Sequence, residues 1–133
     1  KKNVTLKNLT LTNPNGYGNP NGYGLHVEGE EASVEMRDVS VKECENGVML
    51  CGRSKGTFIN CSFHHNEIGV YAQDQGTLVK LRGEETKIHH NNFGVYAYSN
   101  ATIKICIPLQ LITALVHDNS SRDFLTYNNG TMY

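Results

Sequence analysis

The sequence has no block of basic residues, and this absence argues against a nucleic-acid binder. Its 12 Lys and Arg are scattered among 133 residues and are balanced by 13 Asp and Glu, so the formal net charge is -1. Proteins that bind nucleic acid present a basic patch or stripe to the phosphate backbone. We therefore expect no nucleic-acid partner.

Long apolar runs are also missing. The most apolar stretch, residues 103–116, contains Lys104, Pro108 and Gln110 and is too short and too interrupted to span a bilayer. No charged segment followed by an apolar segment opens the sequence, so no signal peptide is visible. Membrane insertion is not expected.

Cysteine is too sparse for a disulfide scaffold. The four cysteines form no C-x-x-C pair, and their simplest interpretation is as buried reduced thiols. Six Asn-X-Ser/Thr triplets point the other way, because they would be glycosylation acceptors in a secretory setting. The localisation therefore stays unknown.

What the sequence does contain is a repeat marked by glycine. Gly69-Val70-Tyr71-Ala72 returns verbatim at residues 94–97 and more loosely at 24–27 and 47–50, so the glycines are 23, 22 and 25 residues apart. Such a period is typical of solenoids, in which each repeat buries its apolar face against its neighbours. The first and last residues show no evident cap, so we expect a segment of a longer solenoid.

Each repeat is expected to hold about three short strands separated by turns rich in Asn and Gly. Apolar residues alternate with polar ones, for example from Ile103 to Leu111, and no segment shows a 3.6-residue apolar stripe. Strands that recur at this period pair with their equivalents one coil away, in parallel. The predicted core comprises Leu9, Leu11, Leu25, Val27, Met36, Val39, Val41, Val48, Leu50, Phe58, Cys61, Phe63, Ile68, Val70, Ile88, Val95, Ala97, Ile103 and Ile105.

Asparagine recurs three residues before the repeated glycine, at Asn21, Asn66 and Asn91, and Asn119 has the matching place in the last turn. Stacked asparagines can pass amide hydrogen bonds from coil to coil, and Asn tolerates the left-handed backbone of a sharp corner. The spacing therefore predicts an asparagine ladder, with the glycine relieving positive φ beside it.

Two segments, 61–72 (CSFHHNEIGVYA) and 86–97 (TKIHHNNFGVYA), resemble the right-handed parallel β-helix repeats of the pectate-lyase-like superfamily. The resemblance implies an all-β, right-handed parallel β-helix of about five coils with 22–25 residues per coil. It implies one domain over residues 1–133, with a loop insertion at residues 13–23. Because this superfamily includes lyases, hydrolases, epimerases, adhesins and non-catalytic scaffolds, it leaves the activity open.

Aspartates are too few and too dispersed for the polysaccharide-cleaving sites that a resemblance to this superfamily would imply. Enzymes of that superfamily resemble one another in clustering Asp for Ca²⁺ binding or acid catalysis. The four aspartates here, Asp38, Asp74, Asp118 and Asp123, fall in different columns of the repeat. No pair is expected within the ~5–10 Å of a two-carboxylate mechanism, so we predict no catalytic residue and no cofactor.

Histidines and tyrosines that recur at one place in successive repeats are the candidate ligand-binding residues. His64 and His89 share a column, where a coil spacing of ~4.8 Å would let both imidazoles approach one metal ion. We favour turn residues without a metal, because no Cys or carboxylate accompanies them at ligand spacing.

Tyr71 and Tyr96 share another column, which is either a ladder of packed rings or a carbohydrate-stacking strip. The pleat of a strand with Val70 inside places both tyrosines on the surface. Tyr17 and Tyr23 belong to the insertion, which is either a plain surface loop or a contact site for sugar or protein.

These observations predict a non-catalytic structural scaffold that docks on protein partners within a larger assembly. The alternative is a polysaccharide-binding or polysaccharide-modifying module, whose site would lie at the tyrosine column.

Overall fold

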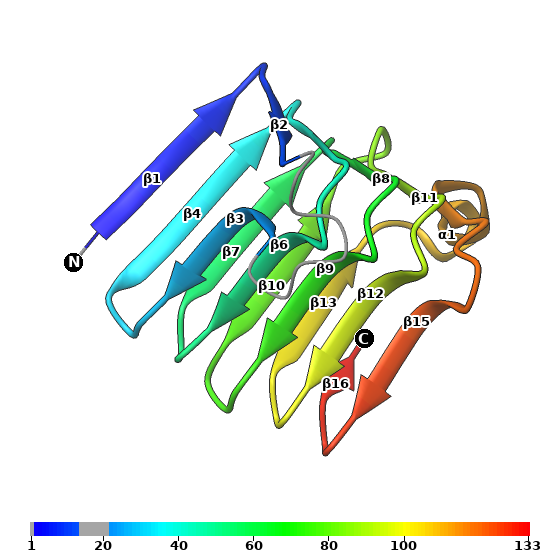
Figure 1. Cartoon of the computed structure of the whole chain (residues 1–133). Helices are drawn as coiled ribbons and strands as arrows, with labels where there is room; N and C mark the ends of the chain where they lie inside the picture. Colours follow the sequence, from blue (N-terminus) through cyan, green and yellow to red (C-terminus); the bar gives the residue numbers. More distant parts are fainter. Residues whose placement is uncertain (1, 14–21) are drawn as a thin grey trace.

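The computed structural model describes residues 2–13 and 22–133, and in it the chain is a solenoid of three parallel β-sheets (Figure 1). Sheet A contains β1 (Lys2–Lys7), β4 (Ala32–Arg37), β7 (Lys55–Ile59), β10 (Leu78–Arg82), β13 (Thr102–Cys106) and β16 (Thr131–Met132). Sheet B contains β2 (Thr10–Thr12), β5 (Ser40–Lys42), β8 (Ser62–His64), β11 (Lys87–His89) and β14 (Val116–His117). Sheet C contains β3 (Tyr23–Glu28), β6 (Asn46–Cys51), β9 (Ile68–Gln73), β12 (Phe93–Tyr98) and β15 (Arg122–Tyr127).

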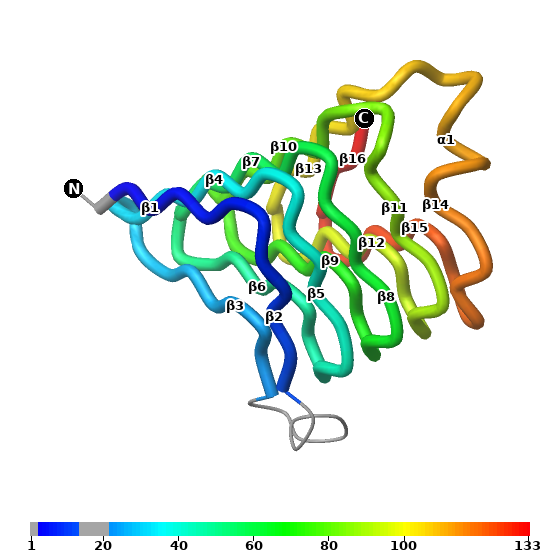
Figure 2. The backbone as a smooth tube through the Cα atoms, turned by 90° about the horizontal axis from the view of Figure 1, so that it is seen from above, coloured from blue at the N-terminus to red at the C-terminus, as the bar shows by residue number. Residues whose placement is uncertain are grey.

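The chain visits sheets A, B and C once per coil before it starts the next coil, as the backbone trace in Figure 2 shows. Sheets B and C hold five strands each. Five stacked strands are separated by four steps, so these two sheets span about four turns, close to the five coils expected, and sheet A adds a sixth strand. The predicted all-β stack of parallel coils is confirmed.

Strands of successive coils pair in register, which places equivalent residues in columns along the solenoid axis. Tyr71 pairs with Tyr96 in sheet C. In sheet B, His64 pairs with His89, and His89 pairs with His117. A repeat in the sequence thereby becomes a row of like side chains in space.

The inner faces of the three sheets form one core. Phe58 and Phe63 are fully buried and meet edge to face, with ring centroids 5.7 Å apart. Most of the predicted core residues are buried, and four more pack against the core while partly buried: Leu9, Leu11, Leu25 and Ile105.

Ile68 is an exception to the predicted core. It is half-buried and absent from the core cluster, whereas Gly69 and Val70 are both buried. Alternation along β9 is thus interrupted at the glycine, and Ile68 falls on the outer side of sheet C. Strict period-2 counting placed it inside.

The repeated glycines are required by close approach between coils. A Cβ built on Gly69 would lie 2.7 Å from the carbonyl oxygen of Gly94, and one built on Gly47 would lie 2.5 Å from that of Gly69. The left-handed corner lies instead at the residue before the asparagine, for example His65 (φ 58°) and His90 (φ 56°). The expectation that Asn and the repeated Gly carry the positive φ at this corner is wrong.

Buried asparagine side chains bond along the axis at the corner between sheets B and C. Asn66 Nδ2 donates to Asn91 Oδ1 (3.1 Å), and Asn91 Nδ2 donates to Asn119 Oδ1 (2.9 Å). Each amide oxygen also accepts a backbone N–H one coil away, including that of Cys44 on Asn66 Oδ1 (3.0 Å). Asp123 accepts from Asn119 Nδ2 (2.8 Å) at the other end. We call Asn66, Asn91 and Asn119 the amide column.

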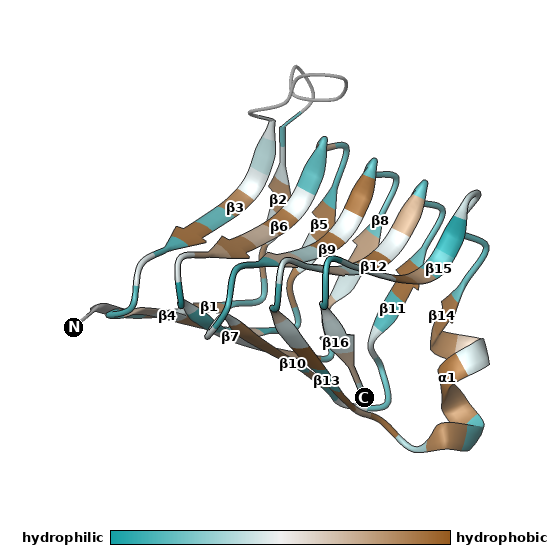
Figure 3. Cartoon of the chain, turned by 90° about the horizontal axis from the view of Figure 1, so that it is seen from below, coloured by the Kyte–Doolittle hydropathy of each residue, from teal (hydrophilic) through white to brown (hydrophobic). Residues whose placement is uncertain are grey.

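A short helix, α1 (Leu109–Leu115), separates β13 from β14. The alternating pattern predicted a strand to Leu111, which is wrong. Pro108 stands at the N-cap, and the missing N–H of proline costs least at a helix start. Leu109 is exposed whereas Leu115 is buried, and the apolar helix appears brown beside the last coils in Figure 3. In residues 2–13 and 22–133, no helix has the length and apolarity needed to cross a bilayer.

We predict that Gly69→Ala lowers the free energy of unfolding by about 2 kcal/mol, because the new methyl group overpacks against the backbone of the next coil. Lys80→Ala, on the outer face of sheet A, is the control and should change it by about 0.5 kcal/mol or less. Urea denaturation measures both. A Gly69→Ala chain as stable as the wild type would contradict the close approach.

We also predict that Asn91→Ala lowers the free energy of unfolding by about 3 kcal/mol. It removes the acceptor of the Asn66 backbone N–H, which then stays buried without a partner, and one of the two acceptors of Asn66 Nδ2, which keeps the Val41 carbonyl. Asn3→Ala removes an exposed amide and should change stability by about 0.5 kcal/mol or less. If Asn91→Ala and Asn3→Ala lower the free energy of unfolding by the same amount, the amide column contributes no more than an exposed surface amide.

Candidate functional site

The outer side of sheet C carries a continuous group of aromatic rings, which we call the aromatic face. Tyr71 and Tyr96 stack with centroids 5.0 Å apart and an interplanar angle of 10°. Tyr98 and Tyr127 stack at 5.9 Å and 4°, and Tyr98 meets Tyr96 edge to face. Phe93 lies 6.2 Å from Tyr96. Outward positions of β9, β12 and β15 thus form one surface.

In each of the two stacked pairs, every tyrosine ring has one face covered by its neighbour. Burial, together with the neighbouring Tyr96, raises the pKa of Tyr71 to about 12, so its hydroxyl is neutral at physiological pH. The Tyr71 hydroxyl donates to Gln73 Oε1 (3.1 Å). The pKa of Tyr96 is also raised by burial. This surface therefore offers uncharged hydroxyl groups set in apolar rings.

The aromatic face is poor in charge. Strands β6, β9 and β12 contain no Asp, Glu, Lys or Arg, and β15 has charged residues only at its start, Arg122 and Asp123. The outer side of sheet A, on the same coils, differs: it carries Glu35, Arg37, Lys55, Lys80 and Arg82. The charged outer side of sheet A is therefore a solvated surface, whereas the outer side of sheet C is suited to contact with another molecule.

Tyr23, another predicted ligand-binding residue, is the first residue of β3, and the centroid of its ring lies 4.5 Å from that of His26. Tyr17 and most of the predicted insertion at residues 13–23 lie outside the described residues.

The histidines form two columns at the corner after sheet B. His64 stacks on His89 (5.2 Å, 3°), and His65 stacks on His90 (5.4 Å, 8°). Within each coil the two imidazoles are hydrogen-bonded through their Nδ1 atoms, at 2.7 Å for His64 with His65 and 2.6 Å for His89 with His90. His117 extends the first column, stacked 5.6 Å from His89.

Partial burial and the neighbouring imidazoles favour the neutral form of His89 and His64 in this corner. Partial burial lowers the pKa of His89 to about 4, and the neighbouring His64, His90, His117 and His65 act in the same direction. The pKa of His64 is also lowered, chiefly by burial. The paired Nδ1 atoms are closer than the ~3.3 Å that two nitrogens keep around a tetrahedral zinc ion, so the pairs are hydrogen-bonded rather than arranged as chelates.

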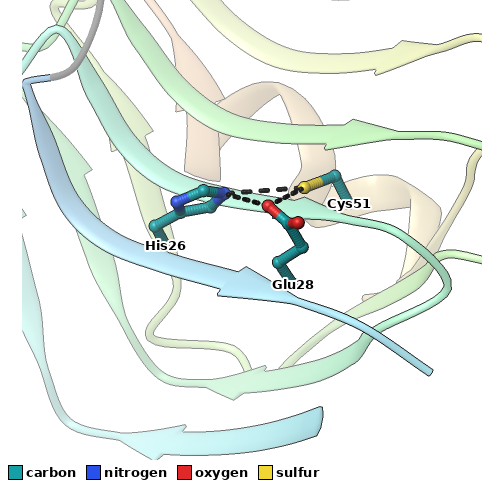
Figure 4. Close-up of side chains that lie close together, drawn as sticks. All are labelled: His26, Glu28 and Cys51. Carbon is teal, nitrogen blue, oxygen red and sulfur yellow. Dashed lines mark hydrogen bonds and ion pairs between the residues drawn. The ribbon is translucent and has the colours of Figure 1, made fainter. Parts of the chain in front are cut away.

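Sequence reasoning missed a third cluster, at the N-terminal end of sheet C. His26 Nε2, Glu28 Oε1 and Cys51 Sγ point toward one another (Figure 4), with separations of 3.5 Å for His26 to Cys51, 3.6 Å for Glu28 to Cys51 and 3.5 Å for His26 to Glu28. Burial and the carboxylate of Glu28 raise the pKa of the Cys51 thiol to about 11. The only available signal was His-x-Glu in one repeat followed by Cys in the next.

An apolar cavity of about 400 Å³ lies between α1 and the last coil. Ile105, Leu109, Phe124 and Met132 are among its lining residues. Apart from Thr126 and Tyr133 its lining is apolar, so the cavity offers chiefly apolar contact.

A family model described as the right handed beta helix region matches residues 1–131. The chain belongs to this right-handed β-helix family. Neither a curated protein nor a solved structure matches the chain. Membership confirms the resemblance seen in the repeats and supplies the handedness of the solenoid, but the family description states no activity.

In this right-handed β-helix protein the aspartates act separately. Asp123 closes the amide column, Asp118 accepts from His117 Nδ1 (2.8 Å), and Asp74 accepts the N–H of Gly52 (2.9 Å). The His117 contact holds the pKa of Asp118 below its usual value. Each of these three carboxylates thus has its own structural partner.

We predict that acid destabilises the chain between about pH 6.5 and pH 4 through the histidine columns. The pKa of His89 is about 4 in the folded chain and 6.5 in the unfolded chain. In that interval the unfolded state binds more protons, so the free energy of unfolding falls as the pH falls and this contribution levels off below about pH 4.

Urea denaturation at about pH 7 and pH 5 measures how much the free energy of unfolding falls between these pH values. The fall should be smaller in the His89→Asn variant. Lys87→Gln, on the same strand but outside the columns, should keep the full loss. If His89→Asn loses as much stability as the wild type between the two pH values, the columns are not its source.

Proposed function

We propose that this chain is a non-catalytic interaction scaffold and that a protein partner binds across its aromatic face. The observation that carries the proposal is the tyrosine-rich outer side of β9 and β12, two strands without Asp, Glu, Lys or Arg. Protein interfaces are enriched in Tyr, Phe and Met and depleted of Lys, Glu and Asp at their centre.

The composition of the face supports a protein partner in two further ways. Its rings are rigid and already stacked, so little side-chain entropy is lost on binding. Polar atoms at the edge, such as the Tyr98 hydroxyl that accepts from Asn128, provide directional contacts.

The ring geometry favours protein over polysaccharide, the alternative. A sugar stacks on the open face of an aromatic ring, whereas Tyr71 and Tyr96 cover each other at 5.0 Å. Edges and hydroxyl groups remain for the partner. Catalysis has no comparable support, because the aspartates that have described partners bond locally and singly.

The test compares two matched double variants for partner binding. Tyr96→Ser with Tyr98→Ser alters the aromatic face, and Lys80→Ser with Arg82→Ser alters the outer side of sheet A on the same coil. Tagged chains are cross-linked in the cells that produce the protein, and the captured proteins are quantified by mass spectrometry. We expect the captured amount of one specific partner to fall at least about tenfold with the tyrosine variant and to stay unchanged with the sheet A variant.

The same chains are tested against a panel of neutral and acidic polysaccharides. Capture that is equal in both variants, or absent from the wild type, would overturn the proposal. Binding of a polysaccharide that only the tyrosine variant loses would replace the scaffold with the alternative. Thermal unfolding of each variant checks that the fold is intact.

A further inference from the structure

We propose that His26, Glu28 and Cys51 form a zinc site on the outer side of sheet C. Among the described residues this is the one group of three His, Cys, Asp or Glu side chains whose ligand atoms all lie within 4.8 Å of one another. Imidazole nitrogen, carboxylate oxygen and thiolate sulfur are the three ligand types that zinc accepts in proteins.

Strand geometry brings the three residues together. His26 and Glu28 are two apart on β3, so both side chains lie on the same side of the strand. Cys51, on β6, is the register partner of Glu28 one coil later. The three side chains converge in Figure 4 from two adjacent strands, which is a rigid base for a metal site.

The distances between the ligand atoms match those around a tetrahedral zinc ion. Usual zinc–ligand lengths and tetrahedral angles require about 3.5 Å between nitrogen and sulfur, about 3.6 Å between oxygen and sulfur, and about 3.4 Å between nitrogen and oxygen. The structure has 3.5, 3.6 and 3.5 Å. A zinc ion would enter with little movement of the protein.

Solvent access leaves a fourth coordination position open. The side chains of His26 and Glu28 are 36% and 69% exposed, whereas Cys51 lies below them with 8% exposure. Tyr23 packs 4.5 Å from His26 and helps to hold its imidazole. Three protein ligands and an open position are the arrangement in which zinc keeps a water molecule or takes a ligand from outside.

Binding changes one bond on the protein. The Cys51 S–H bond breaks as the zinc–sulfur bond forms, and the proton passes to solvent. His26 donates the lone pair of Nε2 and Glu28 that of a carboxylate oxygen. No oxidant or reductant is needed.

Cobalt(II) is the probe, because a tetrahedral cobalt–thiolate site has intense visible bands and a near-ultraviolet sulfur-to-cobalt charge-transfer band. The purified, reduced chain is titrated with Co²⁺ and then with Zn²⁺. We expect one Co²⁺ per chain with the charge-transfer band, and its displacement by one equivalent of Zn²⁺. Cys51→Ser should abolish the band, and His26→Ala should weaken binding by more than about 100-fold.

Glu28→Gln keeps the proposal testable if the buried Cys51 variant fails to fold, since Glu28 is exposed and its loss should also weaken cobalt binding. Cys106→Ser removes an exposed thiol elsewhere and is the matched control that should retain the band. His64→Ala tests the histidine pairs and should also retain it. Cobalt binding without a thiolate band, or a band that survives Cys51→Ser, would overturn the assignment.

Discussion

The structure depends on in-register parallel pairing between successive coils. Because each strand bonds to its equivalent one coil away, every feature of the repeat becomes a column, whether a buried valine, an amide or an aromatic ring. Two constraints hold that register at the corner between sheets B and C. The amide column bonds only when the asparagines are level, and the repeated glycines allow the coils to approach to a distance that any Cβ would prevent.

The same register divides the outer surface into distinct regions. Sheet A turns charged side chains to solvent, sheet C presents tyrosines, and the corner after sheet B carries paired imidazoles. The proposed zinc ligands lie where sheet C begins, upstream of the stacked tyrosines. A partner that binds the aromatic face would therefore find a rigid surface with a polar, metal-binding cluster at its N-terminal end.

Much of this architecture was predictable from the sequence, since a glycine every 22 to 25 residues and alternating apolar positions suffice for parallel coils. The stacking of Tyr71 on Tyr96 and of His64 on His89 follows from the same repeat. Helix α1 was not predictable, because seven residues of an apolar run satisfy a strand pattern equally well. The zinc cluster was missed for another reason: Cys51 joins His26 and Glu28 only through pairing across a whole coil, and no local motif contains all three.

The measurement that tests the account most directly is the pattern of methyl–methyl nuclear Overhauser effects in the chain, whose 133 residues are well within the range of solution NMR. The account predicts contacts from the methyl groups of Val70 to those of both Val48 and Val95, its register partners in the two neighbouring coils. Contacts from Val70 to Met49 or to the ring of Tyr96 in place of these would mean a register shifted by one residue. That result would contradict the columns and everything inferred from them.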